Sequence, residues 1–388
     1  MSHFFSPFNI IAKPIGAICN LGCEYCYYLE KKDLYPETKS FKMSEEVLDD
    51  FTRQYIYGQP ANTAEVNFVW QGGEPTLMGI PFFRKAFSLQ KKYARPGMNI
   101  TNSFQTNGTL LNDDWAELFR DYDVLVGISI DGPEEIHDEF RPDKEGYSSF
   151  YEVMNGLEFL IKHDVRFNTL TCVQSTNSSY PAKIYRFLKN IGSTHLQFIP
   201  IVEPGTNGKV SYRSVHPVKY GSFLCGVFDD WLRSDDVGRI FVQDFDVTLN
   251  LVAGNPSPLC IHAETCGHAM ALEHNGDLYS CDHFVFPEYK LGNIGEQRIE
   301  TLHESGRQQQ FGMDKKGMLP KFCREGEVLS FCNGGCHKDR IRTSPDGEPG
   351  LNYLCHGYKK FYGHSLPVFN KMARCIEMGY PARDYKLV

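Results

Sequence analysis

The chain has 388 residues, of which 41% are hydrophobic and 23% charged, and its formal net charge is −8. That length exceeds what one compact core usually holds, so we expect two domains, or a barrel with an appendage. The negative net charge argues against a nucleic-acid partner. The sequence shows neither an apolar run long enough to span a membrane nor a secretory signal, so we expect a cytoplasmic protein with no membrane partner.

Up to about residue 235, short apolar strands alternate with amphipathic helices. The strands are rich in β-branched and aromatic residues, and most end in Gly, Asn or Asp. This alternation predicts an α/β fold with a parallel sheet, whose functional edge lies where the strands end. The predicted strands are 9–18, 66–73, 102–108, 124–132, 166–173 and 195–202, and the predicted helices are 44–56, 81–93, 113–122, 149–163, 180–191 and 217–232.

The alternation fades near residue 235, where we place a boundary between domains 1–235 and 236–388. Residues 255–356 are rich in Cys, Gly, His and Pro, and their hydrophobic periodicity is weak. Such a segment buries little core, so we expect metal coordination to hold it together. Residues 361–379 predict one last helix.

Most of the 13 cysteines fall in two clusters with short internal gaps. A secreted disulfide scaffold is one interpretation, but such scaffolds are smaller and carry a signal peptide. In a reducing compartment, clustered thiols are more often metal ligands.

The first cluster consists of Cys19, Cys23 and Cys26, directly after the first predicted strand. A cubane iron–sulfur cluster normally takes four cysteines, so three leave one iron open for a substrate or cofactor. A structural zinc site with a distant fourth ligand is the alternative.

This C-x3-C-x2-C loop resembles the signature of the radical S-adenosylmethionine (SAM) superfamily, whose fold is a partial (β/α)6, TIM-like barrel. The aromatic Tyr25 before the last cysteine fits the same signature. Residues 71–75, Gln-Gly-Gly-Glu-Pro, resemble the family's SAM-binding GGEP motif. The paired glycines, including Gly73, would let the backbone approach a ligand, and Glu74 is expected to accept from the methionyl ammonium. A plain turn is the alternative for GGEP, but it leaves the cysteine loop unexplained.

Four further positions match SAM-contacting positions of the family: Ser129, Asp131, Arg141 and Val202. Arg141 suits the methionyl carboxylate and Val202 the adenine face. A core position is the alternative for Val202.

The second cluster resembles the SPASM extension, which binds auxiliary iron–sulfur clusters. The resemblance implies that one auxiliary [4Fe-4S] cluster is held by Cys260, Cys266, Cys281 and Cys336, and a second by Cys323, Cys332 and Cys355. Gly326 stands where the pattern has a fourth ligand, so the second cluster has an open iron, an oxygen ligand such as Glu325, or a smaller nuclearity. We therefore expect one or two auxiliary clusters.

Across nearly the whole chain, the sequence is similar to the anaerobic sulfatase-maturating enzymes; matching segments include 13–31, 68–77, 125–141, 266–294 and 349–358. The resemblance implies that a Cys or Ser in a C/S-x-P-x-R motif of an unfolded or nascent sulfatase is oxidised to Cα-formylglycine. It implies reductive SAM cleavage to a 5′-deoxyadenosyl radical, which takes a hydrogen from Cβ, while the second electron leaves through an auxiliary cluster. A reductase, flavodoxin or ferredoxin would supply electrons.

Asp282, next to Cys281, matches the family's catalytic aspartate and is our candidate base for the substrate thiol or hydroxyl proton. Capping of the local turn is the alternative role. Residues expected to orient the base or contact the peptide are His283, Gln105, Asn107 and Tyr28.

Two other functions stay open at this point. A related SPASM maturase that modifies another ribosomal peptide would share every cluster motif, and Asp282 with the whole-chain match argues against it. A metal-binding regulatory or electron-carrier protein would have no need of GGEP or Ser129.

Overall fold

The structure is a computed structural model that describes residues 6–205 and 209–387. The chain forms two units. The first contains the chain up to Ser129 together with Phe140–Phe167 and Gly267–Gly312, and the second contains Ile130–Glu139, Asn168–Cys266 and the chain from Met313. Both units include residues from before and after position 235, and the division into 1–235 and 236–388 stays a prediction.

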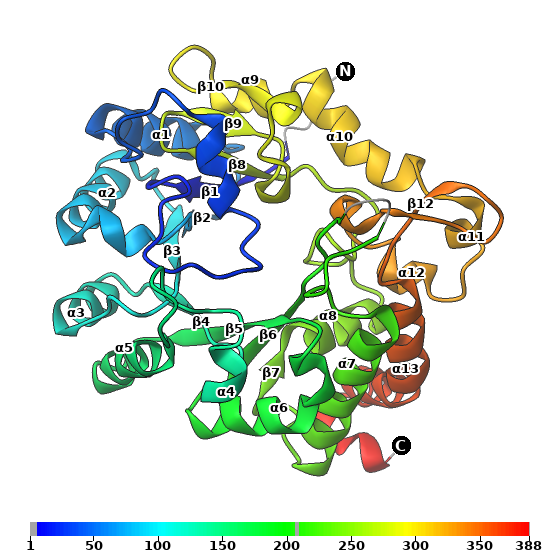
Figure 1. Cartoon of the computed structure of the whole chain (residues 1–388). Coiled ribbons are helices and arrows are strands. Elements are labelled where there is room, and N and C mark those ends of the chain that lie inside the picture. The colour runs from blue at the N-terminus through cyan, green and yellow to red at the C-terminus, as the bar shows by residue number, and fades with distance from the viewer. Residues whose placement is uncertain (1–5, 206–208, 388) are drawn as a thin grey trace. The chain divides into compact units, whose positions relative to one another are not determined.

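The first unit contains a mainly parallel sheet. The strands follow the order β10–β9–β8–β1–β2–β3–β4, and β1 lies between β2 and β8, parallel to both. The register pairs Ile10 with Phe68 on one side and with Met270 on the other. The strands β8 to β10, drawn in yellow beside the blue β1 in Figure 1, were not predicted from the sequence. The bounds are β1 Asn9–Lys13, β2 Glu65–Trp70, β3 Asn99–Thr106, β4 Leu125–Ser129, β8 Ala269–Glu273, β9 Asp277–Tyr279 and β10 Lys290–Asn293.

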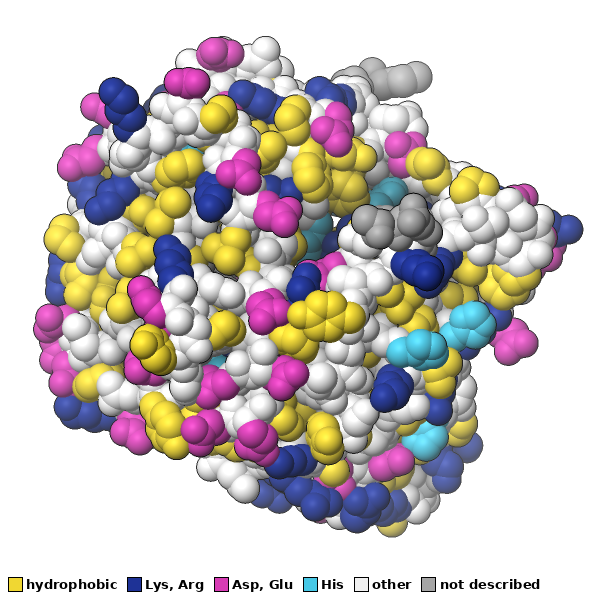
Figure 2. Space-filling view, in the orientation of Figure 1, with side chains coloured by type: hydrophobic (Ala, Val, Ile, Leu, Met, Phe, Trp, Pro, Cys, Tyr) yellow, Lys and Arg dark blue, Asp and Glu magenta, His cyan; other side chains and the backbone are white. Residues whose placement is uncertain are grey.

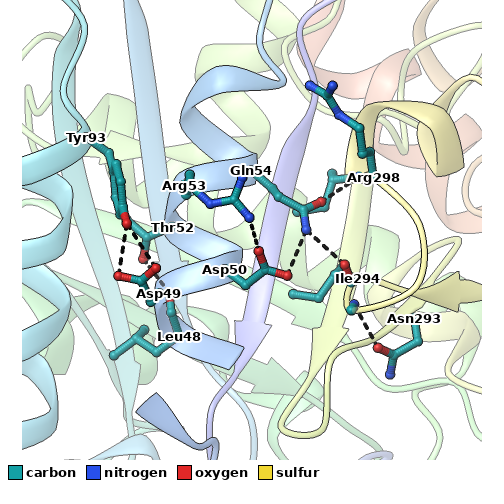
Figure 3. Close-up of polar contacts among 12 residues, drawn as sticks. Leu48, Asp49, Asp50, Thr52, Arg53, Gln54, Tyr93, Asn293, Ile294 and Arg298 are labelled. Carbon is teal, nitrogen blue, oxygen red and sulfur yellow. Dashed lines mark hydrogen bonds and ion pairs between the residues drawn. The ribbon is translucent and has the colours of Figure 1, made fainter. Parts of the chain in front are cut away.

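Four helices of the first unit follow the predicted alternation: α1 Glu45–Tyr57, α2 Ile80–Tyr93, α3 Asp113–Asp121 and α5 Phe150–Lys162. The unit also contains α9 Ile299–His303 and the first part of α10 Gly306–Gly317, which were not predicted. Ser44 caps α1, since its hydroxyl accepts from the Val47 amide at 3.2 Å. Gln54 joins α1 to the chain after β10: it donates to the Ile294 carbonyl at 2.8 Å and accepts from the Ile299 amide at 2.9 Å (Figure 3).

The second unit contains β5 Phe167–Val173 (apart from its first residue), β6 His195–Pro200 and β7 Phe241–Val242, paired in parallel. Its long helix α13 starts at Cys355 and ends at Glu377, so it begins earlier than predicted. α13 packs on α7 at two glycines: a Cβ on Gly221 would lie 2.5 Å from the Gly357 carbonyl oxygen. The other bounds are α4 Glu134–His137, α6 Pro181–Asn190, α7 Pro217–Arg233, α8 Gln243–Val252, α11 Lys321–Arg324, α12 Leu329–Cys332, β11 Arg342–Thr343 and β12 Pro349–Leu351.

The alternating strand side chains supply the core. Ile10, Phe68, Phe104 and Val126 are at most 1% exposed, and each such side chain contributes about 1.5–3 kcal/mol to stability. Acidic and basic side chains are both spread over the visible face (Figure 2), and several form exposed pairs such as Lys162–Asp113 that contribute little.

The α/β class, the six predicted strands and the final helix are confirmed. No disulfide forms among the 13 cysteines. Within residues 6–205 and 209–387, no helix has the length and apolarity needed to cross a membrane.

Candidate active site

The loop with Cys19, Cys23 and Cys26 follows β1 in the first unit. It turns tightly, with the Cys26 amide bonded to the Cys23 carbonyl at 3.1 Å and the Leu21 amide pointing at Cys19 Sγ at 3.4 Å. Burial raises the pKa of the Cys19 thiol to about 12, and the negative charges of Glu74, Cys23 and Cys26 add to this. The Cys19 thiolate is thus disfavoured in the free protein, and bound iron is the kind of positive charge that reverses this. The loop therefore fits a cluster.

The GGEP turn braces this loop. The Gly73 amide donates to the Gly16 carbonyl at 2.8 Å and the Glu74 amide to the Ile18 carbonyl at 2.9 Å. A Cβ on Gly73 would lie only 2.0 Å from the Ile18 carbonyl oxygen, so only glycine fits there. The two motifs singled out in the sequence thus meet directly at the residue before Cys19.

Glu74 is buried, and both of its carboxylate oxygens already accept hydrogen bonds. The donors are the Thr76 amide and hydroxyl, the Thr106 hydroxyl at 2.9 Å and the Asn107 amide at 2.8 Å. Glu74 therefore connects the end of β2 to the end of β3, whether or not an ammonium group also reaches it. Asn107 continues the connection, since its side-chain amide donates to Asn20 at 2.9 Å and points at Cys19 Sγ at 3.7 Å.

Four more predicted residues of the first unit lie at polar contacts. Arg141 is 5% exposed and donates to the Tyr25 hydroxyl at 3.0 Å, which fixes a cation beside the cysteine loop. Gln105 donates to the Ser129 hydroxyl at 3.0 Å, so these two side chains at the ends of β3 and β4 face each other.

Asp282 follows β9 and is 8% exposed. It forms an ion pair with Lys13 and accepts a hydrogen bond from the Tyr27 hydroxyl. Burial by itself would raise the pKa of Asp282, but Lys13, His283 and Tyr27 outweigh it and hold the pKa below the ordinary value. The carboxylate is therefore ionised and oriented.

Lys13, the last residue of β1, was missed in the sequence. It is completely buried, donates to Gln71 at 2.8 Å and lies 4.2 Å from the ring centroid of Tyr28. A lysine at the end of an apolar strand indicates a buried ion pair, because a buried charge needs a partner. Its partner could not be read from a sequence in which Asp282 is distant.

The two tyrosines after the cysteine loop differ from each other in burial. Tyr28, expected to face the peptide, is 2% exposed and donates its hydroxyl to Glu273, which in turn lies 3.0 Å from His274 Nδ1. Tyr27 is the partly exposed one, and it reaches Asp282. The sequence alone could not predict which of these two adjacent tyrosines is buried.

The second unit holds the remaining cysteines predicted as ligands, apart from Cys281. Burial raises the pKa of Cys266 to about 12, and nearby Cys260 and Cys336 add to this. Burial likewise raises the pKa of Cys323 to about 11, with Cys355 and Cys332 contributing. Three of the four cysteines predicted for the first auxiliary cluster, and all three predicted for the second, thus interact with one another within this unit. Cys281 lies in the first unit, so its share in the first auxiliary cluster stays a prediction.

Val202 and Gly326 also lie in the second unit. Val202 is 9% exposed and follows β6. Gly326 closes a turn by donating to the Cys323 carbonyl at 3.0 Å, and its φ is not positive. Its backbone therefore does not demand glycine. In the described part of the chain, no three His, Cys, Asp or Glu side chains converge on a single-ion site.

Comparisons with known proteins agree on one family. Residues 14–188 match the radical SAM superfamily and residues 260–326 match an iron–sulfur cluster-binding domain, SPASM. A serine-type anaerobic sulfatase-maturating enzyme of Bacteroides thetaiotaomicron is 47% identical over 96% of this chain and 92% of its own length. A cysteine-type enzyme of Clostridium perfringens is 34% identical over 96% of this chain and 100% of its own length.

A solved structure described as native anSMEcpe with bound AdoMet and Cp18Cys peptide is also similar. It superposes with a TM-score of 0.85 at 32% identity, covering 95% of this chain and 99% of that one. The partial barrel, the SPASM domain and the C-terminal helix expected from the sequence are thereby confirmed.

Proposed function

The chain belongs to the anaerobic sulfatase-maturating enzymes, radical SAM proteins that convert a Ser or Cys of a sulfatase to formylglycine, and from this premise we propose that serine is its preferred target and Asp282 its base. The serine preference is supported by relatives: serine-type enzymes match at 47% and 38% identity, and cysteine-type enzymes at 34%.

The observation that carries the assignment of the base is the setting of Asp282. Lys13 and Tyr27 hold its carboxylate in the same unit as the cysteine loop. When bound, SAM and the iron–sulfur cluster supply the 5′-deoxyadenosyl radical. Loss of a hydrogen atom from Cβ makes the serine hydroxyl far more acidic, so a carboxylate with a depressed pKa can still accept that proton.

We propose that the radical SAM cluster is held by Cys19, Cys23 and Cys26, with SAM at the open iron. SAM would be contacted by Tyr25, Gly73, Glu74, Ser129, Arg141 and Val202. Support comes from the braced loop and from the buried guanidinium of Arg141, whose fork suits a carboxylate.

We propose two auxiliary clusters, one at Cys260, Cys266, Cys281 and Cys336 and one at Cys323, Cys332 and Cys355. The peptide substrate is an unfolded or nascent sulfatase segment of the S-x-P-x-R or C-x-P-x-R type, and a flavodoxin, ferredoxin or reductase supplies electrons. We place this reaction in the cytoplasm, where reduced thiols and nascent chains occur together.

The test is anaerobic incubation of the reconstituted enzyme with SAM, a reductant and paired peptides that differ only in Ser or Cys at the target position. We expect an aldehyde on both by mass spectrometry, with the higher kcat/KM for serine. Asp282→Asn should still form 5′-deoxyadenosine but lose about 10²–10⁴-fold in aldehyde formation. A crosslinked or otherwise altered peptide without aldehyde would contradict the proposed reaction, and full aldehyde yield in Asp282→Asn would contradict the proposed base.

A further inference from the structure

A short loop in the second unit connects a cysteine of one predicted auxiliary cluster to a cysteine of the other. Residues 332–336 read Cys-Asn-Gly-Gly-Cys, and the proposed function assigns Cys332 and Cys336 to different auxiliary clusters. The three middle residues all have left-handed backbone conformations, with φ of 42° at Asn333, 70° at Gly334 and 62° at Gly335. Such a run is rare outside glycine-rich loops and needs something to hold it.

Arg340 holds this loop. Its guanidinium donates to the carbonyls of Gly334 and Asn333, each at 3.1 Å, and to the carbonyl of Lys315 at 2.6 Å. A Cβ on Gly334 would lie 2.8 Å from Arg340 Nη2, so glycine allows this close approach.

Lys315 holds the same loop from a second direction. It is 1% exposed and donates to the Asn333 carbonyl at 3.3 Å and to the carbonyl of Ala263, which lies between Cys260 and Cys266. Lys315 therefore ties the segment of Cys260 and Cys266 to the loop between Cys332 and Cys336.

The charges of these two cations are not cancelled locally. Among the described residues, neither Lys315 nor Arg340 has a carboxylate within ion-pair distance, and their bonds go to backbone carbonyls. Lys338, beside Cys336, differs because it pairs with Asp339 at 2.7 Å. Burial and Arg340 lower the pKa of Lys315 to about 8, which leaves it mainly protonated at neutral pH.

Both cations lie next to the segments that carry the predicted ligands. Lys315 and Arg340 each donate to the carbonyl of Asn333, which follows Cys332, and Lys315 also donates to the carbonyl of Ala263, between Cys260 and Cys266. Iron–sulfur clusters on thiolates are anionic, and reduction adds one more negative charge, so a nearby buried cation favours the reduced form.

We infer that Lys315 and Arg340 are positioning residues that clamp the Cys332–Cys336 loop and raise the reduction potential of the auxiliary clusters. The inference rests on the proposed function for the identity of those clusters. It gives Lys315 and Arg340 a role in the electron transfer of the proposed reaction. Oxidation of serine to an aldehyde releases one hydrogen atom, one proton and one further electron, and that electron needs an oxidised cluster as acceptor.

The test is an EPR-monitored redox titration of the full-length, reconstituted protein in which Cys19, Cys23 and Cys26 are replaced by alanine, so that only auxiliary clusters contribute. We compare Lys315→Met and Arg340→Gln with Lys316→Met. Lys316 is the neighbouring residue, but its side chain is 59% exposed and pairs with Glu264. Neutralising either buried cation should lower the reduced-to-oxidised ratio at a fixed potential at least tenfold, which for a one-electron couple is about 59 mV.

Lys315→Arg keeps the charge and should keep the potential near that of the parent. Parent-like potentials in both neutral variants would overturn the inference, and so would loss of auxiliary iron from both, since the pair would then serve assembly alone. The potential is measured without turnover, so absence of aldehyde in the peptide assay would contradict the proposed function and leave this result standing.

Discussion

At the scale of single residues, the active site combines groups that sequence patterns reveal with groups that they hide. The cysteine loop and GGEP were visible because their spacing is local, and the structure adds that Gly73 touches the residue before Cys19. Lys13 and Tyr27 were hidden because their contacts to Asp282 come from distant parts of the chain. The long-range partner of a buried charge is set by the tertiary fold.

The first residue-scale prediction concerns the ion pair of Lys13 and Asp282. Lys13→Met should lower the free energy of unfolding by about 3–5 kcal/mol, because it leaves a buried carboxylate without its cation. The double variant Lys13→Met with Asp282→Asn should recover part of that loss, since neither charge then remains. Urea denaturation of all four proteins gives the coupling energy. Strict additivity of the two single changes would show that the pair does not interact.

The second residue-scale prediction concerns Gly326. Gly326→Cys should slow the loss of iron from the second auxiliary cluster in air, because a fourth thiolate would complete its ligand set. The backbone permits the change, since φ is not positive and a Cβ would meet the Cys323 carbonyl oxygen at a tight but adjustable 3.1 Å.

Gly306→Cys is the control for Gly326→Cys, because a Cβ there meets nothing within 4 Å. Iron and sulfide analysis against time of exposure gives the rates. Equal rates in the parent and Gly326→Cys would mean that position 326 does not face the cluster.

At the scale of elements, the predicted alternation was right where strands were long and apolar. It missed β8 to β10 because they lie after residue 235, where the hydrophobic periodicity is weak, and because β8 pairs in parallel with β1, far away in sequence. It also began the last helix late, because Cys and Gly at residues 355–357 do not favour a helix by themselves. Packing of α13 on α7 compensates for that weak propensity.

The element-scale prediction uses that helix pair. Gly221→Ala should destabilise the protein by about 1–3 kcal/mol although alanine favours helices, because its Cβ would overlap the Gly357 carbonyl oxygen at 2.5 Å. Gly363→Ala, on α13 with nothing within 4 Å, should instead stabilise by about 0.5–1 kcal/mol. Thermal unfolding of the two variants should shift in opposite directions. Shifts of the same sign would refute the close helix contact.

At the scale of the whole molecule, the cysteine-bearing segments of the second unit are held by other means than the sheets and long helices. The first unit has an apolar sheet, and the sequence predicted its strands β1 to β4 from their hydrophobic pattern. In the second unit, the cysteine-bearing segments 253–266 and 320–356 contain at most short helices and strands, and polar side chains such as Lys315, Arg340 and Asn333 hold their backbones. The sequence composition predicted that the cysteine-bearing segments bury little apolar core. The polar contacts that hold them could be identified only from the structure.

The whole-molecule prediction is that removing iron affects the two units unequally. Anaerobic chelation of the reconstituted enzyme should speed amide hydrogen exchange in residues 255–266 and 320–356, because bound clusters replace the apolar core that these segments lack. Strands β2 and β3 in the first unit should keep their protection, since buried side chains such as Phe68 and Phe104 maintain them. Mass spectrometry of peptic fragments follows both regions in one sample. Unchanged exchange in the cysteine-rich segments would show that they are folded without iron, and equal acceleration in β2 and β3 would show that the clusters support both units alike.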